Sequence, residues 1–516
     1  MSNGRLDPVT LSVLASALAG IAEEMGAVLI RGSYSSNIKE RRDCSTALFD
    51  ARGRMVAQAE HIPVHLGAMP EAVAAIRRRN PEPGDVFAIN DPYSGGTHLP
   101  DITLVSPVAP GEDGEILGYA VTRAHHSDVG GMRPGSAPSD SREIYQEGII
   151  IPPVKLVWGG DYVDDVLDLL LANVRTPAIR RGDLRAQIAA NQIAEERVGE
   201  LIERRGKGIV LAAFDEVISY TERRTREVIR ELPDGEYSAE DFMEGDGTVD
   251  EDIPIRAKVR ISGDSMSIDF AGTSDAVRGN VNCPLAVTRS ACYFALRVLL
   301  PGDVPANAGT YASLEIKAPE GSLVNAKSPS AVVAGNVETS SRIADTVLSA
   351  LSEASELPAQ GQGTMNNLII GGSGWTYYET IGGGQGASAS GDGPSGVHVG
   401  MSNTLNTPTE AFELEYPMRV ERYELLYGSG GEGKHRGGDG IVRSVRVLQP
   451  ASLSLLTDRR RHGPRGVEGG EPGRVGRNLL GDEELPPKVS REMKEGDVVT
   501  VETPGGGGYG RVDESR

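Results

Sequence analysis

The chain has 516 residues, of which 24% are charged and 39% hydrophobic, and its formal net charge is −21. This length predicts two or more packed units, and the acidity, with no basic stripe to offset it, argues against nucleic-acid binding. No uninterrupted apolar stretch approaches the roughly 18 residues of a membrane span, no secretory signal is visible, and Cys44, Cys283 and Cys292 form no C-x-x-C pair, so we expect a cytoplasmic protein with buried, unreactive thiols and no membrane contact.

The first predicted element is a long helix that begins at Asp7-Pro8. An acidic N-cap followed by proline at the first helical position is a helix-start signal, and apolar residues then recur at spacings of three and four through Val28. Residues 44–58 predict two short strands around a D-A-R-G turn. A short second helix is expected over residues 65–79.

Residues 84–151 change to short apolar runs separated by glycine, proline and aspartate. These runs predict strands that are linked by tight loops; they read VFAIN, ITLVSPV, ILGYAVTRA and GIIIPPVKL. Two long helical patterns follow, over residues 183–205 and 206–232.

The second half of the chain has a different pattern. After a turn at PDGEY, apolar and polar residues alternate over residues 253–270 and predict a β-hairpin. A helix is expected over residues 340–351, and from Thr364 onward glycine and short strands predominate. We therefore predict an α+β fold of more than one domain, with helices and short strands in residues 1–235 and a mostly β, glycine-rich region in residues 236–516.

Three of the eight histidines lie within one short stretch of the first region. His98 and Asp101 form an H-x-x-D pair in a Gly/Pro-rich loop, and His125, His126 and Asp128 follow at the end of a predicted strand. Neutral imidazole and carboxylate groups hold Zn²⁺, Mn²⁺ or Fe²⁺ with an open coordination position. We therefore predict one divalent metal ion here, in preference to histidines that only satisfy loop hydrogen bonds.

Adjacent side chains of a strand point to opposite faces, so only one of His125 and His126 is expected to bind the ion. We favour His125 slightly and keep both as candidates. Asp128 could orient a ligand imidazole or act as a base, and Asp91, in NDPYSGG, could play the same part. Asp43 lies where a charged run meets a strand; it is a further candidate ligand, although a solvated acid or an ion pair with a neighbouring arginine is the simpler interpretation.

Two glycine-rich motifs have the letters of nucleotide-binding loops. Residues 428–435 nearly spell a phosphate-binding loop, but His435 replaces the hydroxyl that holds Mg²⁺ and no helix pattern follows. Residues 391–396 match G-x-G-x-x-G without a surrounding βα unit. We interpret both as accidental, and we expect the glycine clusters to form turns. The spacing of Glu338, Glu379 and Arg422 does not show whether these residues line a path for the substrate or form ordinary ion pairs at the surface.

Several long segments resemble one known family. They are DPVTLSVL, IKERRDCSTALFD, NDPYSGGTHLPDITLVSPV, HHSDVGG, EGIIIPPVKL, GNVETSSRIADTVLSAL and TPGGGGYG. In these motifs, which span nearly the whole chain, the sequence resembles the hydantoinase B/oxoprolinase family. The resemblance carries metal-ligand roles to His98, Asp101 and a histidine of HHSDVGG, and it strengthens the case for Asp43.

The resemblance also implies a function. The chain would be the metal-dependent catalytic subunit of an ATP-dependent hydrolase that opens cyclic amides such as hydantoins, 5-oxoproline or lactams. A hydantoinase A-like partner subunit would bind ATP and Mg²⁺ and phosphorylate the carbonyl oxygen of the substrate, and water activated by the metal would then displace the phosphorylated oxygen.

Two alternatives stay open on the sequence. The same motifs occur in subunits of ATP-dependent ketone carboxylases of the acetone and acetophenone type, which would join an activated ketone to bicarbonate. A non-catalytic scaffold subunit with a structural metal is the other alternative.

Overall fold

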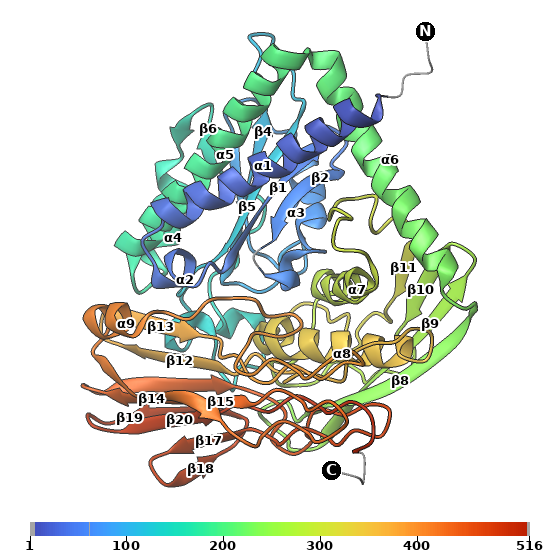
Figure 1. The fold of residues 1–516 in the computed structure, drawn as a ribbon. Helices are drawn as coiled ribbons and strands as arrows, with labels where there is room; N and C mark the ends of the chain where they lie inside the picture. The colour runs from blue at the N-terminus through green and yellow to red at the C-terminus, as the bar shows by residue number, and fades with distance from the viewer. Residues whose placement is uncertain (1–5, 61, 513–516) are drawn as a thin grey trace.

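The computed structural model describes residues 6–60 and 62–512 (Figure 1). In this part of the chain the first sheet is antiparallel and has seven strands in the order β2-β1-β5-β4-β3-β6-β7. The strands are β1 (Cys44–Asp50), β2 (Met55–Glu60), β3 (Val86–Ile89), β4 (Asp101–Val108), β5 (Gly118–His125), β6 (Val154–Trp158) and β7 (Asp161–Tyr162). The predicted β1–β2 hairpin is confirmed.

Helices cover one face of this sheet (Figure 1). They are α1 (Pro8–Gly32), α4 (Asp164–Ala172), α5 (Pro177–Arg205) and α6 (Lys207–Glu231), with the short α2 (Ser36–Lys39) at the end of α1. The Asp7 side chain accepts hydrogen bonds from two backbone N–H groups of the first turn, as the start signal predicted. By length and composition α1 could cross a membrane. Its buried side chains, however, form one hydrophobic cluster with α5, α6 and the sheet, which is the packing of a core helix.

Three local predictions need correction. Helix α5 begins at Pro177, before residue 183, because proline is well suited to the first turn of a helix. The segment GIIIPPVKL becomes a strand only from Val154, since its two prolines cannot donate to a ladder. The helix expected over residues 65–79 is a 3₁₀ turn at Pro63–His65 followed by α3 (Met69–Arg77).

The opposite face of the sheet packs against the first part of the second half. Strands β8 (Gly235–Glu244), β9 (Asp252–Ser262), β10 (Ser265–Asp269) and β11 (Leu314–Lys317) form a sheet in the order β11-β10-β9-β8, so the predicted hairpin is confirmed. Helices α7 (Leu285–Leu299) and α8 (Ser340–Leu351) lie between the two sheets (Figure 1). No sequence pattern had predicted α7. A single π-helical turn, η4 (Gly335–Thr339), leads into α8.

The last part of the chain forms two further sheets. One has the order β13-β12-β16-β19 and the other the order β14-β15-β20-β17-β18. Their strands are β12 (Asn367–Gly372), β13 (Trp375–Glu379), β14 (Met418–Leu426), β15 (Gly440–Val447), β16 (Ala451–Leu456), β17 (Arg477–Leu480), β18 (Glu483–Leu485), β19 (Lys488–Met493) and β20 (Val498–Glu502), with α9 (Thr409–Glu415) beside them. The two sheets share one hydrophobic cluster and form a sandwich.

Strands β12 and β13 bury side chains on both of their faces. Leu368, Ile370 and Tyr377 belong to the sandwich cluster. Ile369 and Tyr378 point the other way, into the largest hydrophobic cluster, which we call the central core. This core also contains side chains of β1, β5, α3, α7, α8 and β9. Residues on both sides of position 235 therefore share it, and the α+β class is confirmed.

Most of the clustered glycines are not turn positions, which corrects the sequence-based expectation. Extended segments are joined by backbone hydrogen bonds, as between Gly431 N and Gly506 O at 2.8 Å and between Gly506 N and Gly438 O at 2.9 Å. A Cβ atom on Gly506 would lie 2.0 Å from a backbone oxygen of Gln385. Glycine is needed here because the backbones lie too close together for any side chain.

Candidate metal centre

The register of three neighbouring strands brings together acids and a histidine that are far apart in the sequence. Asp101 begins β4 and is the cross-strand partner of His125, which ends β5. On the other side of β5, Cys44 pairs with Ala124, so Asp43 lies beside His125, whose N–H donates to the Asp43 carbonyl at 3.0 Å. Cross-strand neighbours project from the same face of a sheet. The ends of β1, β5 and β4 therefore place Asp43, His125 and Asp101 side by side.

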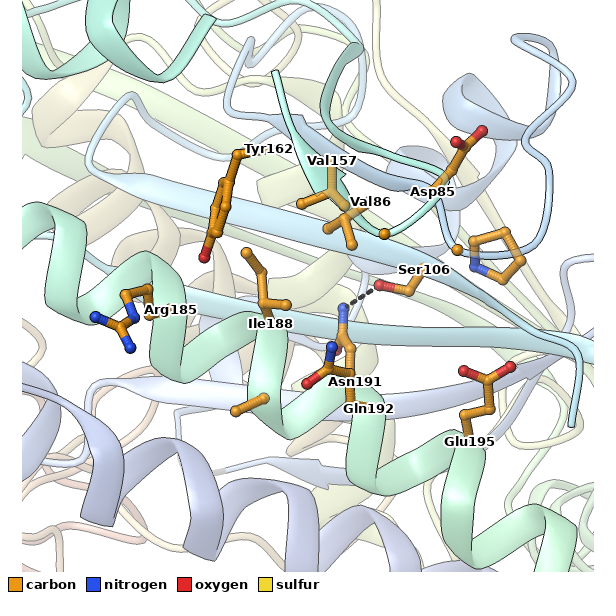
Figure 2. Close-up of a pocket in the computed structure, with 14 residues that line it drawn as sticks. Asp85, Val86, Ser106, Val157, Tyr162, Arg185, Ile188, Asn191, Gln192 and Glu195 are labelled. Atoms are coloured by element: carbon orange, nitrogen blue, oxygen red, sulfur yellow. Dashed lines mark hydrogen bonds between the residues drawn. The ribbon is translucent and has the colours of Figure 1, made fainter. Parts of the chain in front are cut away.

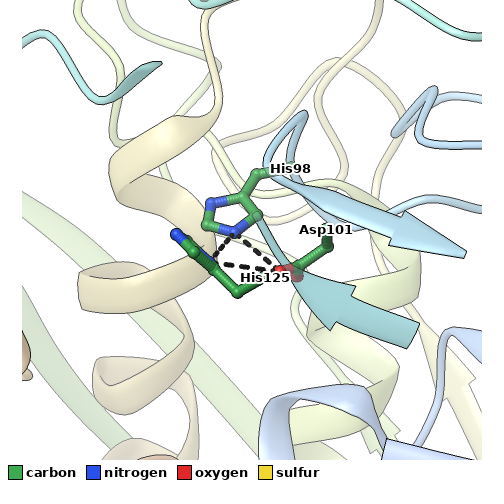
Figure 3. A group of neighbouring side chains, drawn as sticks. All are labelled: His98, Asp101 and His125. Carbon is green, nitrogen blue, oxygen red and sulfur yellow. Dashed lines mark hydrogen bonds and ion pairs between the residues drawn. The ribbon is translucent and has the colours of Figure 1, made fainter. Parts of the chain in front are cut away.

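His98 completes a cluster of three donor atoms (Figure 3). The distance from His98 Nε2 to His125 Nδ1 is 3.1 Å, from His98 Nε2 to Asp101 Oδ1 3.1 Å, and from His125 Nδ1 to Asp101 Oδ1 3.3 Å. A metal ion about 2.0–2.2 Å from each ligand needs donor atoms about 2.8–3.6 Å apart, whether the geometry is octahedral or tetrahedral. The three atoms meet this requirement.

The two imidazole nitrogens lie within hydrogen-bonding distance of each other, but the carboxylate oxygen that faces them is left without a hydrogen bond in the described part of the chain. All three side chains are buried, and within residues 6–60 and 62–512 Asp101 Oδ1 accepts no hydrogen bond of normal geometry although two imidazole nitrogens face it. Buried polar atoms of native proteins are nearly always paired. Three lone-pair atoms that converge on one point fit a bound cation, and the nitrogen and oxygen donor set fits Zn²⁺, Mn²⁺ or Fe²⁺.

The electrostatics of the cluster favour the metal-binding protonation states of Asp101 and His125 but oppose that of His98. Burial opposes ionisation of Asp101, but the surrounding histidines, His98 first, hold its pKa well below the usual range. Burial lowers the pKa of His125. Burial also acts against protonation of His98, yet the neighbouring Asp101 charge raises the pKa of His98. An ionised carboxylate and a neutral imidazole are the ligand forms, so protons on His98 would compete with the metal.

Asp43 lies at the edge of the cluster. Its Oδ2 is 4.0 Å from His125 Nδ1, and the side chain is buried. It is not one of the three converging donors.

The other predicted residues point elsewhere. His126 turns to the opposite face of the sheet, where its Nε2 lies 2.9 Å from Gln187 Oε1 on α5. It therefore lies outside the cluster, because successive strand residues alternate. The Asp128 carboxylate accepts hydrogen bonds from loop N–H groups and from Arg175, and the Asp91 carboxylate closes a turn at Tyr93 and Ser94. Both acids thus hold loops, and neither is bonded to a histidine of the cluster.

One neighbour was missed by the sequence interpretation. His65, in the 3₁₀ turn after β2, has its Nε2 3.5 Å from Asp101 Oδ2, while its Nδ1 lies 2.9 Å from Ser45 Oγ. Thr97 Oγ1 also donates to Asp101 Oδ2. No motif spacing could have found His65, because only the tertiary fold brings its turn against β4.

A separate cavity lies on the helix-covered face of the same sheet (Figure 2). It has a volume of about 380 Å³ and is lined by β3, β4, the β6–β7 hairpin and α5. Ser106 and Asn191 meet across it by a hydrogen bond of 3.0 Å. Ser106 points away from the face that carries Asp101, so this cavity is not part of the metal centre.

Residues 7–512 match the family model described as Hydantoinase B/oxoprolinase. The chain belongs to this family. It is 40% identical to 5-oxoprolinase 1 of Arabidopsis thaliana, over 98% of this chain and 42% of that protein, and 36% identical to a putative D-/L-hydantoinase subunit of a Pseudomonas species, over 98% of this chain and 90% of that one.

Two solved structures are similar to this member of the hydantoinase B/oxoprolinase family. The ATP-dependent caprolactamase of Pseudomonas jessenii superposes with a TM-score of 0.89 at 31% identity, covering 98% of this chain and 91% of that one. Nucleotide-free acetone carboxylase superposes with a TM-score of 0.87 at 20% identity, covering 98% and 76%. The second likeness shows the fold alone.

Proposed function

We propose that this chain is the metal-dependent catalytic subunit of a cytoplasmic, ATP-dependent hydrolase of cyclic amides. The observation that carries the proposal is the convergence of His98 Nε2, Asp101 Oδ1 and His125 Nδ1 on one point. Family membership supports the reaction class, since relatives are named 5-oxoprolinase, hydantoinase and caprolactamase. Residues 1–235 would supply the ligands, and residues 236–516 would pack against them.

The chain's own residues would have distinct tasks. His98, Asp101 and His125 would hold one divalent ion, with Asp43 as a candidate fourth ligand. When bound, such an ion makes water a nucleophile at neutral pH and polarises a carbon–oxygen bond. Asp101 would stay ionised because the histidines around it stabilise its charge, and His65 and Thr97 would fix its second oxygen. Burial of the donors would keep bulk water out.

ATP would be handled by a hydantoinase A-like partner in a hetero-oligomer. In the described residues, the loop that ends at His435 continues into strand β15 and not into a helix, so it lacks the form of a phosphate-binding loop. The chain also spans only about two fifths of the plant 5-oxoprolinase but nine tenths of the Pseudomonas hydantoinase relative. The name of the second relative, a hydantoinase subunit, supports a partner subunit for this chain.

The test uses the chain co-purified with its hydantoinase A-like partner. With ATP, the complex should open 5-oxoproline, a hydantoin or caprolactam, and His98→Ala should abolish product while the complex stays folded and still hydrolyses ATP. If instead His98→Ala lowers the melting temperature and leaves the activity of the folded fraction unchanged, the metal is structural and the chain is a scaffold.

Ketone carboxylation is the second candidate, because the sequence motifs of this chain resemble those of ketone carboxylase subunits as well, and the shared fold is compatible with it. The same complex should be given acetone or acetophenone with ATP and labelled bicarbonate. Incorporation of label without opening of any cyclic amide would replace the first proposal with this one.

A further inference from the structure

The orientation of the His125 ring is not fixed in the usual way. Its Nδ1 faces His98 and Asp101, whereas its Nε2 is buried and has no hydrogen-bond partner among the residues that the structure describes. Metal-binding imidazoles are generally held by a hydrogen bond from the ring nitrogen that does not bind the ion. Another contact must therefore select this ring orientation.

Tyr378 provides that contact. Its ring is stacked on the His125 ring with a centroid distance of 4.4 Å and an angle of 12° between the planes. Tyr378 lies on β13 and points into the central core, toward the end of β5. Flat stacking over a neighbouring ring restricts rotation of an imidazole about its side-chain bonds, because any tilted orientation would collide with the ring below.

The tyrosine is itself fixed at its hydroxyl end. Tyr378 Oη donates to Asn367 Oδ1 at 2.8 Å, on the neighbouring strand β12. Asn367 Nδ2 donates to Glu338 Oε1 and to the Leu456 carbonyl, both at 2.8 Å. Because both acceptors lie on the amide nitrogen side, the Asn367 oxygen must face Tyr378.

Glu338 anchors this chain of contacts. It is fully buried on the π-helical turn η4, and its Oε1 also accepts a hydrogen bond from Met365 N at 3.1 Å. Single π-helical turns inside α-helices are often found at functional sites. At the other end of Tyr378, Arg41 Nη1 donates to the Tyr378 carbonyl at 2.7 Å, so backbone and hydroxyl are both held.

We propose that Tyr378, fixed by Asn367 and Glu338, is the positioning residue that sets the His125 ring for metal binding. The inference rests on the proposed metal centre. It assigns a function to residues of the glycine-rich half, since contacts from β12, β13 and η4 complete a centre whose ligands all come from the first half.

The test measures Co²⁺ binding to the purified chain by titration, together with the visible spectrum of the bound ion. Tyr378→Leu, which removes the stacked ring, should weaken Co²⁺ binding by about 10–100-fold, as loss of a supporting contact does at other metal sites, and should alter the spectrum. Tyr378→Phe keeps the ring and loses the hydrogen bond to Asn367, so we expect a smaller loss of Co²⁺ affinity than in Tyr378→Leu. Glu338→Ala should resemble Tyr378→Phe, whereas Glu338→Gln keeps an acceptor oxygen and should bind nearly as wild type.

Tyr377→Phe is the matched control. Tyr377 is the adjacent residue on β13, points into the sandwich and packs on Phe412 and Tyr416. Its substitution should leave Co²⁺ affinity within about twofold, because its hydroxyl lies outside the chain of contacts that supports the ligand.

The outcomes separate this inference from the function on which it rests. If wild-type protein binds no Co²⁺, the metal centre itself is wrong and the inference fails with it. If wild type binds and folded Tyr378→Leu binds equally well with the same spectrum, only the inference is overturned. Should Tyr378→Leu fail to fold, equal affinities of Tyr378→Phe and Tyr377→Phe overturn it.

Discussion

Two buried polar clusters of this molecule are built on opposite principles. In the ionic cluster of the second half, Asp458 lies 2.9 Å from both Arg342 and Lys488, and Asp241 lies 3.1 Å from Arg459. Both of these carboxylates face cations. At the metal centre, two imidazole nitrogens and a carboxylate oxygen face one another at 3.1–3.3 Å.

The difference shows what each cluster needs. A buried charge is tolerated when an opposite charge and hydrogen bonds compensate it, so the ionic cluster is complete within the chain. The candidate metal centre instead gathers two imidazole nitrogens and a carboxylate oxygen around one point, and in the proposed function a bound ion compensates the carboxylate. The contrast predicts that the first cluster stabilises the fold and that the second binds the ion of the proposed reaction.

The largest expected effect tests this contrast with two adjacent histidines. His125→Ala should remove stoichiometric metal and abolish product formation, because it deletes one of three converging donors. His126→Ala, one residue later but on the helix-covered face, should keep metal and activity. Elemental analysis of the two purified variants measures their metal content. Equal metal content in both would contradict the assigned centre.

The second prediction concerns the ionic cluster. Asp458→Asn removes the charge that faces Arg342 and Lys488 and should lower the free energy of unfolding by about 3–5 kcal/mol, as broken buried ion pairs do. Metal content of the folded fraction should not change. The control is Asp303→Asn, whose exposed pair with Arg224 should contribute less than about 1 kcal/mol. An equal loss of free energy of unfolding in both variants would show that the buried ion pairs stabilise the fold no more than an exposed pair does.

The third prediction uses pH to probe Glu338, which lies between the two clusters. Burial and the neighbouring Asp458 raise the pKa of Glu338 to about 7. The pKa of Glu338 is higher in the folded state than in the unfolded state, so folding favours the protonated carboxyl. Its contribution to the free energy of unfolding is therefore fully present below the unfolded pKa and is lost as the pH rises toward 7. Glu338→Gln should therefore gain stability relative to wild type as pH rises from about 4.5 to about 8, by about 3 kcal/mol at most. Chemical denaturation across this pH range measures the free energy of unfolding of both proteins. If the two plots of free energy against pH run parallel, the prediction is contradicted.

The smallest expected effect concerns Asp43. Its carboxylate is 4.0 Å from His125 Nδ1, outside the three converging donors. Asp43→Asn should weaken metal affinity about tenfold, equivalent to about 1.4 kcal/mol. Complete loss of metal would instead make Asp43 an obligatory ligand, and unchanged affinity would place it outside the centre. Competition with a chelator of known affinity measures the change.

Local signals predicted much of the fold. Asp7-Pro8 fixed the start of α1, and the alternation over residues 253–270 predicted the β9–β10 hairpin. Local sequence patterns did not predict the segments whose conformation depends on contacts with residues that are distant in the sequence. Helix α7 packs against α8 and the 3₁₀ turn at Pro63–His65, and the glycines near residue 506 are set by backbones that are distant in sequence.

Residue types and spacing alone predicted a metal centre of His98, Asp101 and one of two adjacent histidines, because imidazole and carboxylate groups are the ligands of such ions. The choice between the two histidines needed the fold, since strand register places His125 beside Asp101 and turns His126 toward α5. The contributions of His65 and Tyr378 were likewise invisible in the sequence. They depend on packing between segments that no local pattern connects, and such packing is determined only when the whole chain is folded.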